Sequence, residues 1–219
     1  MHNVTVAFAV LLVMLLSYFF GCFNGSFMVS HFIIRDDVRK HGSGNAGLTN
    51  FYRTYGAKYA LLVIACDMGK TVVACLLGSF FFRCLGWDGT LGTLLAGLGC
   101  ELGHIFPVFY GFRGGKGILS GGTLVLLLNW RVAAVAWALF LLLWLTTRYV
   151  SLASITATCS APITVYFVYG HNWLYTGLCL AVAALVVWCH RENIQRLLHG
   201  TEKKFKWHVN PTEGKDPPE

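Results

Sequence analysis

The sequence contains four polar stretches whose residue types suit the binding of phosphate groups. The first, residues 37–53, places Gly42, Gly44 and Gly47 in one short segment. Glycines allow positive φ values and a close approach to a ligand, and successive N–H groups in such a loop form a nest that binds anions. Side chains that donate neutral or charge-assisted hydrogen bonds complete the set: Ser43, Asn45, Thr49, Asn50 and Arg53. These residues favour an anion site, although a flexible polar loop would use the same residue types.

A second glycine-rich turn follows an apolar segment near residue 110. Gly114, Gly115 and Gly117 surround Lys116, and a compact ammonium among backbone N–H groups again suits a phosphate. The alternative is a basic turn that contacts anionic lipid headgroups. His104, upstream of the turn, is either a catalytic group or a helix histidine that is hydrogen-bonded to a neighbour.

Two shorter polar stretches lie at the ends of later apolar segments. Residues 146–154 offer Ser151 and Ser154, although helix capping and interfacial anchoring explain such residues equally well. Residues 190–196 place His190 and Asn193 three positions apart, so the two side chains share one helical face. An amphipathic helix at the membrane surface would explain this stretch without any chemistry. The residues alone leave both alternatives open.

Several ionisable residues lie within or beside the apolar segments. Asp67 and Lys70 are three residues apart in one of them, and isolated charges are costly in a membrane, so we predict that they pair. Glu101, in another, has no obvious partner. His31 and Asp36 match the HxxxxD spacing of a His–Asp acyltransferase dyad. We interpret that match as a coincidence, because His31 belongs to an apolar run.

The composition indicates which class of protein positions these residues. Hydrophobic residues make up 56% of the 219 residues, charged residues 12%, and the mean hydropathy is +0.59. A soluble domain carries about 25% charged residues, so the composition excludes a soluble protein, a disordered chain and a nucleic-acid-binding module. The eight cysteines include no CxxC pair. We expect them to pack as small apolar residues, with no disulfide, metal or cofactor.

Seven apolar segments approach the roughly 20 residues that a membrane-spanning helix needs. They predict an all-α, polytopic membrane protein with seven transmembrane helices, at Val4–Ile34, Ala57–Phe82, Leu91–Phe109, Ile118–Leu128, Arg131–Leu145, Val150–Val168 and Trp173–Cys189. Ile118–Leu128 is the weakest span, because its rise of about 16 Å falls short of a hydrocarbon core of about 30 Å. It is therefore a partial or re-entrant helix unless it extends into the flanking glycines.

The distribution of Lys and Arg predicts the orientation. The first, third and fifth loops and the C-terminal segment together hold fourteen Lys and Arg residues, whereas the other side holds only Arg83 and Arg131. Positive residues accumulate on the cytoplasmic side, so we expect the N-terminus outside and the C-terminus in the cytoplasm. All four polar stretches then face the cytoplasm. This favours an enzyme at the membrane–cytosol boundary over a transporter, whose site would lie near mid-membrane between matching halves.

The amino-acid sequences of these stretches, and their order along the chain, resemble those of a known family. DVRKHGSGNAGLTNFYRTYG (37–56), GHIFPVFYGFRGGKGI (103–118), TRYVSLAS (147–154) and HREN (190–193) with Arg196 follow one another along the chain. Together with Asp67-Met-Gly-Lys70 they closely resemble the membrane acyl-phosphate:glycerol-3-phosphate acyltransferases, the PlsY family. The resemblance runs from about residue 21 to residue 200.

The resemblance implies a bacterial inner-membrane enzyme with its motifs toward the cytoplasm. Such an enzyme transfers a fatty acyl group from acyl phosphate to the sn-1 hydroxyl of glycerol 3-phosphate, which gives lysophosphatidic acid and phosphate and opens phospholipid synthesis. The resemblance implies no metal and no cofactor. The expected partners are the two substrates and membrane lipids, with no nucleic acid, and we expect a monomer. The alternative function is a membrane transporter of a phosphorylated metabolite.

The motif matches also assign roles. The Gly42–Gly47 loop with Ser43 and Arg53 is expected to bind acyl phosphate, and Gly114–Gly117 with Lys116 to bind glycerol 3-phosphate. Ser154, or else Ser151, supports one phosphate, and His190 and Asn193 complete the site. The general base is either His190 or a phosphate oxygen of a substrate, and the absence of a carboxylate from the motifs favours the substrate.

Two regions depart from the family pattern or lie outside it. The family usually has Gly-Ser-Ile-Pro in the first helix, where this chain has Gly21-Cys-Phe-Asn24, so the bend of that helix is in question. We expect residues 1–200 to form a single transmembrane catalytic domain. Residues 201–219 are polar and include three prolines, which predicts a disordered cytoplasmic tail without a catalytic duty.

Overall fold

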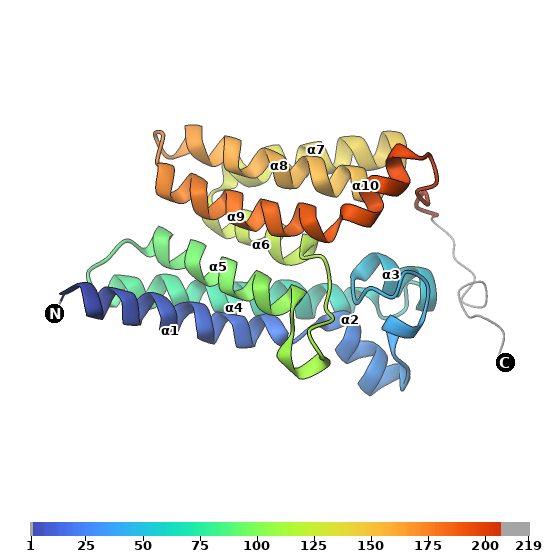
Figure 1. The fold of residues 1–219 in the computed structure, drawn as a ribbon, viewed down its shortest axis with the longest axis horizontal. Helices are drawn as coiled ribbons and strands as arrows, with labels where there is room; N and C mark the ends of the chain where they lie inside the picture. The colour runs from blue at the N-terminus through green and yellow to red at the C-terminus, as the bar shows by residue number, and fades with distance from the viewer. Residues whose placement is uncertain (1, 207–219) are drawn as a thin grey trace.

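The computed structural model describes residues 2–206, and every regular element within them is a helix. The long helices form two layers, with α6 between them (Figure 1). The first layer holds α1 (His2–Cys22), α4 (Ala60–Cys84) and α5 (Gly89–Ile105). The second holds α7 (Trp130–Thr147), α8 (Val150–Val168) and α9 (Trp173–Cys189), and α6 comprises Ile118–Leu128.

Each of the seven predicted apolar segments contains a helix. Within residues 2–206, five helical stretches are long and apolar enough to cross a membrane, and the pair formed by α9 and α10 (Arg191–Leu198), bent by 59°, would be a sixth. The eleven residues of α6 are too few for a span of ordinary length. The chain is therefore an all-helical protein with several candidate membrane spans.

Glycines allow the helices of the first layer to pack unusually closely. A Cβ at Gly99 would lie 2.5 Å from the carbonyl oxygen of Met14 on α1, and one at Gly103 would lie 2.0 Å from that of Tyr18. The spacing of four places both glycines on the same face of α5, so the backbones of α1 and α5 come into direct contact. Small residues at such spacings are typical of helix pairs in membranes, where close van der Waals contact drives association.

The first predicted span, Val4–Ile34, is interrupted. α1 ends at Cys22, a short helix α2 follows at Gly25–Met28, and a π-helical segment covers Val29–Ile34. Asn24 occupies the break and caps α2 by accepting a hydrogen bond from the Phe27 N–H (2.9 Å). Its amide also donates to the carbonyl of Ala46 (2.9 Å), so the break is joined to the first glycine-rich loop.

The short elements gather at one end of the molecule, opposite the start of α1 (Figure 1). That end holds α2, α3 (Leu48–Tyr55), the start of α6 and α10. Asp88, Asn129 and Asn172 cap the first turns of α5, α7 and α9, the helices that begin at the other end. The fold therefore brings the four polar stretches of the sequence to the same end of the helical layers.

Candidate active site

The first glycine-rich loop is held in shape by Asn50, a buried residue of α3. Its side-chain oxygen accepts a hydrogen bond from the Ser43 N–H (3.0 Å), and its amide donates to the carbonyls of Val38, His41 and Asn45 at 3.0–3.1 Å. Gly42 and Gly44 within the loop adopt positive φ values, +59° and +69°. The sequence predicted Asn50 as a binding residue, and here its amide is fully engaged in shaping the loop.

The second glycine-rich loop lies directly against the first. The carbonyl of Gly114 accepts hydrogen bonds from the N–H of Ala46 (3.3 Å) and the amide of Asn45 (3.4 Å). Gly115 donates to the carbonyl of His104 (3.1 Å), and a Cβ at Gly115 would lie 2.1 Å from the His104 ring nitrogen Nε2. Gly114 and Gly115 therefore allow this loop to pack closely against His104 at the end of α5.

Lys116 connects this loop, through hydrogen bonds, to α8 and α10. Its ammonium donates to the side-chain oxygen of Asn193 on α10. The amide of Asn193 donates in turn to Glu202 (2.7 Å), and the hydroxyl of Ser151 donates to the same carboxylate oxygen (2.7 Å). The other carboxylate oxygen of Glu202 accepts from Arg196 Nε (2.7 Å). One polar network therefore joins the GGKG turn, α8, α10 and the segment after α10.

The charges in this network shift one another's pKa values. Burial lowers the pKa of Lys116, and the nearby charge of Arg196 lowers it further, while Glu202 acts in the opposite direction. Burial likewise lowers the pKa of Arg53. Burial of Glu202 disfavours its ionised form, but hydrogen bonds from Arg196, Ser151 and Asn193 outweigh this and lower its pKa. Three basic side chains, Arg53, Lys116 and Arg196, thus lie near the carboxylate of Glu202.

Residues 201–206, which the sequence placed in a polar tail, lie across this site. Arg53 donates to the carbonyl of Lys203 (3.1 Å), and the Phe205 N–H donates to the carbonyl of Arg148 (2.8 Å). The Phe205 ring lies 5.3 Å from that of Tyr52 and 5.4 Å from that of Trp144, centroid to centroid. The sequence analysis missed Glu202 and its neighbours, because nothing local in the segment indicates that it folds back. The remainder of the predicted tail, residues 207–219, lies outside the described residues.

His190 and Ser154 contribute the remaining polar atoms. The ring nitrogen Nδ1 of His190 lies 2.8 Å from the carbonyl oxygen of Val186. Because a carbonyl oxygen only accepts hydrogen bonds, Nδ1 carries the proton and Nε2 is left as an acceptor. The buried hydroxyl of Ser154 has no hydrogen-bond partner within the described part of the chain. Both residues line the same cavity, so each has a polar atom to offer a ligand.

That cavity has a volume of about 1140 Å³ and is lined mainly by α6, α7, α8 and α9, with α3, α4 and α10 at its polar end. All the predicted site residues line it except Gly44, Gly114 and Gly115. Thr49 and Gly47 form part of its wall beside α3, and Gly117 part of its wall beside α6. Away from this polar end, its walls become almost wholly apolar, with Ile64, Val125, Ala136, Trp137, Ala161 and Cys179 among the residues. The cavity therefore suits a ligand with an anionic head and a long apolar part.

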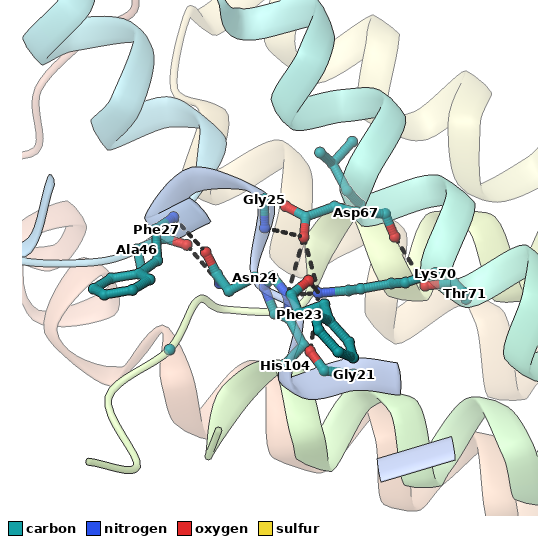
Figure 2. Close-up of polar contacts among 12 residues, drawn as sticks. Gly21, Phe23, Asn24, Gly25, Phe27, Ala46, Asp67, Lys70, Thr71 and His104 are labelled. Atoms are coloured by element: carbon teal, nitrogen blue, oxygen red, sulfur yellow. Dashed lines mark hydrogen bonds and ion pairs between the residues drawn. The ribbon is translucent and has the colours of Figure 1, made fainter. Parts of the chain in front are cut away.

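A buried ion-pair cluster supports the cavity from the first layer (Figure 2). Lys70 Nζ lies 2.8 Å from an Asp67 carboxylate oxygen, which confirms the predicted pair, and 2.7 Å from His104 Nδ1. Lys70 also donates to the carbonyls of Gly21 and Phe23 (3.1 Å each), which the break after α1 leaves without helical partners. His104 is thus hydrogen-bonded to a neighbour, and it also lines the cavity.

Other sequence predictions concern residues outside the cluster. His31 stacks on Phe27 with ring centroids 5.2 Å apart, whereas Asp36 contacts His41 (2.9 Å), so the HxxxxD residues make separate contacts. All eight cysteines are free. Within residues 2–206, no three His, Cys, Asp or Glu side chains are placed to hold a metal ion. The Oε1 atom of Glu101 has no hydrogen-bond partner among the described residues.

Comparison with known proteins gives a consistent match. Residues 11–200 match the family model described as glycerol-3-phosphate acyltransferase. The glycerol-3-phosphate acyltransferase of Syntrophomonas wolfei is 38% identical over 88% of this chain and 95% of its own length. That of Alkaliphilus metalliredigens is 40% identical over 89% of this chain and 95% of its own length.

Solved structures agree with the sequence comparison. The glycerol 3-phosphate form of PlsY (YgiH), an integral membrane glycerol 3-phosphate acyltransferase, superposes with a TM-score of 0.80 at 36% identity, covering 90% of this chain and 96% of that one. Its lysophosphatidic acid form gives 0.78 at 34%, with the same coverage. The proteins named here are acyltransferases, so the alternative of a transporter gains no support. The family resemblance of the motifs is confirmed, and the chain belongs to the glycerol-3-phosphate acyltransferase family.

Proposed function

We propose that this membrane enzyme transfers a fatty acyl group from acyl phosphate to the sn-1 hydroxyl of glycerol 3-phosphate. The observation that carries the proposal is a single cavity with glycine-rich loops and several basic side chains, Arg53, Lys116 and Arg196 among them, at one end and apolar walls beyond. Such a cavity accommodates two phosphate groups beside each other and a fatty chain below them. The relatives of known structure are titled as glycerol 3-phosphate and lysophosphatidic acid forms, which supports this choice of substrate and product.

The geometry supports a direct transfer without a covalent enzyme intermediate. The sn-1 oxygen attacks the acyl carbonyl carbon, the bond between that carbon and the phosphate oxygen breaks, and phosphate departs with the bonding electron pair. The loop with Ser43 and Arg53 holds the acyl phosphate, and Lys116 with Asn193 holds glycerol 3-phosphate. Ser154, with Ser151 beside it, supports the phosphates. Positioning alone can supply about 7–11 kcal/mol of the barrier in such a reaction, and fixed donors near the developing oxyanion supply more.

The proton of the sn-1 hydroxyl has two possible acceptors, a substrate phosphate oxygen and His190 Nε2. We propose the phosphate oxygen, because within residues 2–206 no carboxylate is hydrogen-bonded to His190 to raise its basicity, and its Nδ1 bonds to a backbone carbonyl. We expect His190→Gln to keep kcat within about tenfold, whereas loss of a true general base typically costs 10²–10⁴-fold. Burial lowers the pKa of His190 to about 4, so steady-state kinetics that extend down to that pH measure this. A hundredfold loss of kcat, together with disappearance of the acidic limb of the profile, would identify His190 as the base.

The orientation in the membrane is part of the proposal. The start of α1 and the end of α10 lie at opposite ends of the helical layers (Figure 1), which supports an odd number of crossings. We propose seven crossings, with α6 as a short one, the N-terminus outside and the polar end in the cytoplasm. The distribution of Lys and Arg supports this orientation. The localisation is then a bacterial inner membrane, and all the proposed site residues belong to one chain, as a monomeric enzyme would require.

The donor is the most informative point to test. Purified full-length protein should acylate glycerol 3-phosphate with hexadecanoyl phosphate as donor and should fail with hexadecanoyl-CoA or hexadecanoyl acyl-carrier protein. Lysophosphatidic acid and released phosphate should appear in equal amounts, because each transfer breaks one acyl–phosphate bond. Product formed from the CoA thioester alone would overturn the choice of donor.

A further inference from the structure

The inner end of the apolar part of the cavity, here called the floor, is formed by side chains of four helices. On each of four helices, the lining residue farthest from the polar end has a small or short side chain: Val125 on α6, Ala136 on α7, Ala161 on α8 and Cys179 on α9. About one turn further along each helix lies a larger side chain of the same packed cluster: Leu128, Val132, Val165 and Tyr175. None of these four lines the cavity.

These larger side chains close the bottom of the cavity. Leu128, Val132 and Val165 are buried, with 9%, 0% and 0% of their surface exposed. Leu94 of α5, 1% exposed, joins the same cluster from the first layer. Packed interiors of this kind leave no room for further methylene groups. An acyl chain that enters from the polar end therefore meets a barrier on α6, α7, α8 and α9.

The depth of the floor follows from the number of helical residues between it and the polar end. Cys179 precedes His190 by eleven residues on α9, and Ala161 follows Ser151 by ten residues on α8. At a rise of 1.5 Å per residue the floor lies about 15–17 Å below the polar end. Each carbon of an extended chain adds about 1.25 Å, from a C–C bond of about 1.52 Å and an angle of about 111°. The cavity therefore holds about 12 or 13 carbons beyond the carbonyl.

We propose that this floor makes the cavity a ruler for the acyl chain, with Ala136, Ala161 and Cys179 as the residues that set the length accepted. The inference deepens the proposed function, since it names the substrate range of the same site. Chains of up to about fourteen carbons are held in full. Each carbon beyond that gains no further burial, because it must bend back or leave the cavity. The apolar contribution to kcat/KM, roughly fourfold per buried methylene, should then stop rising near fourteen carbons.

Substitutions at two depths test the ruler. Ala183 lines the cavity seven residues before His190, about 10 Å below the polar end. Ala183→Leu should therefore move the preferred chain to about eight to ten carbons, and Ala161→Leu to about twelve. Ala184 and Ala134 neighbour the lining positions Ala183 and Ala136 but are exposed on the outer helix faces. Their change to Leu is the matched control, and it should leave the preferred length unchanged.

The measurement is kcat/KM of the full-length protein for saturated acyl phosphates of 8 to 18 carbons. In parallel, thermal stabilisation by lysophosphatidic acids of the same lengths reports binding without any donor, so failure of the proposed donor leaves the ruler testable. A graded shift, larger for Ala183→Leu than for Ala161→Leu in both measurements, supports the ruler. The ruler is overturned if both kcat/KM and the thermal stabilisation of the wild type rise steadily with chain length up to eighteen carbons. It is also overturned if the lining and control substitutions give the same length profile.

Discussion

Lys116→Met is expected to lower kcat/KM for glycerol 3-phosphate by about 10²–10³-fold, the loss typical of removing one preorganised donor from a charge-stabilising site. The ammonium of Lys116 donates to Asn193, which is joined to Ser151 through Glu202. Methionine keeps much of the length of the side chain but removes the charge. Steady-state kinetics with purified protein would measure the effect.

The same loop provides the control. Arg113 is also a cation of this glycine-rich turn, but it is exposed and does not line the main cavity. In Arg113→Met, kcat/KM for glycerol 3-phosphate should therefore stay within about threefold of the wild-type value, because an exposed charge is screened by water and salt. If Arg113→Met and Lys116→Met lose equal activity, the effect belongs to the net charge of the loop and Lys116 has no specific role.

The pKa of Lys116 gives this prediction a pH dependence. Burial lowers that pKa from the ordinary value of a lysine. As pH rises, Lys116 therefore loses its proton, and with it the charge that holds phosphate, earlier than an exposed lysine does. We expect kcat/KM of the wild type to fall on the alkaline side at a lower pH than the titration of an exposed lysine would give. In Lys116→Arg the residual activity should persist to higher pH, because a guanidinium keeps its proton.

Lys70→Met is expected to destabilise the protein by about 3–5 kcal/mol, the range observed when one partner of a buried ion pair is removed. Asp67 is 1% exposed and Lys70 7% exposed. The ammonium faces Asp67, His104 and the two carbonyls freed by the break after α1 (Figure 2). Without it, a carboxylate and two carbonyl oxygens would be left in a region from which water is excluded. The unfolding midpoint in detergent micelles would measure the loss.

A double variant separates charge compensation from packing. Asp67→Leu combined with Lys70→Met removes both charges, so it should be less destabilised than Lys70→Met alone. The double variant should still be less stable than the wild type, because the carbonyls of Gly21 and Phe23 lose their hydrogen-bond donor. Lys58→Met, at an exposed lysine just before the same helix, should stay within about 0.5 kcal/mol of the wild type. Equal losses in the single and double variants would contradict the compensation argument.

The sequence by itself determined the class of protein, the positions of the long helices and most of the residues that line the candidate site. These features depend on short-range properties: the length of an apolar run, the glycine content of a loop and the identity of the cation beside it. The i,i+3 pair of Asp67 and Lys70 was predictable for the same reason, since one helical turn brings the two side chains together.

Only the tertiary structure decided which groups from distant parts of the chain meet. Glu202 accepts from Ser151 at a separation of 51 residues, and Lys70 donates to the Gly21 carbonyl at a separation of 49. The floor of the cavity likewise depends on which small side chains of α6, α7, α8 and α9 lie at the same depth. No local pattern encodes such meetings, because helix periodicity fixes the face of each side chain, whereas the register between helices follows from how their surfaces pack.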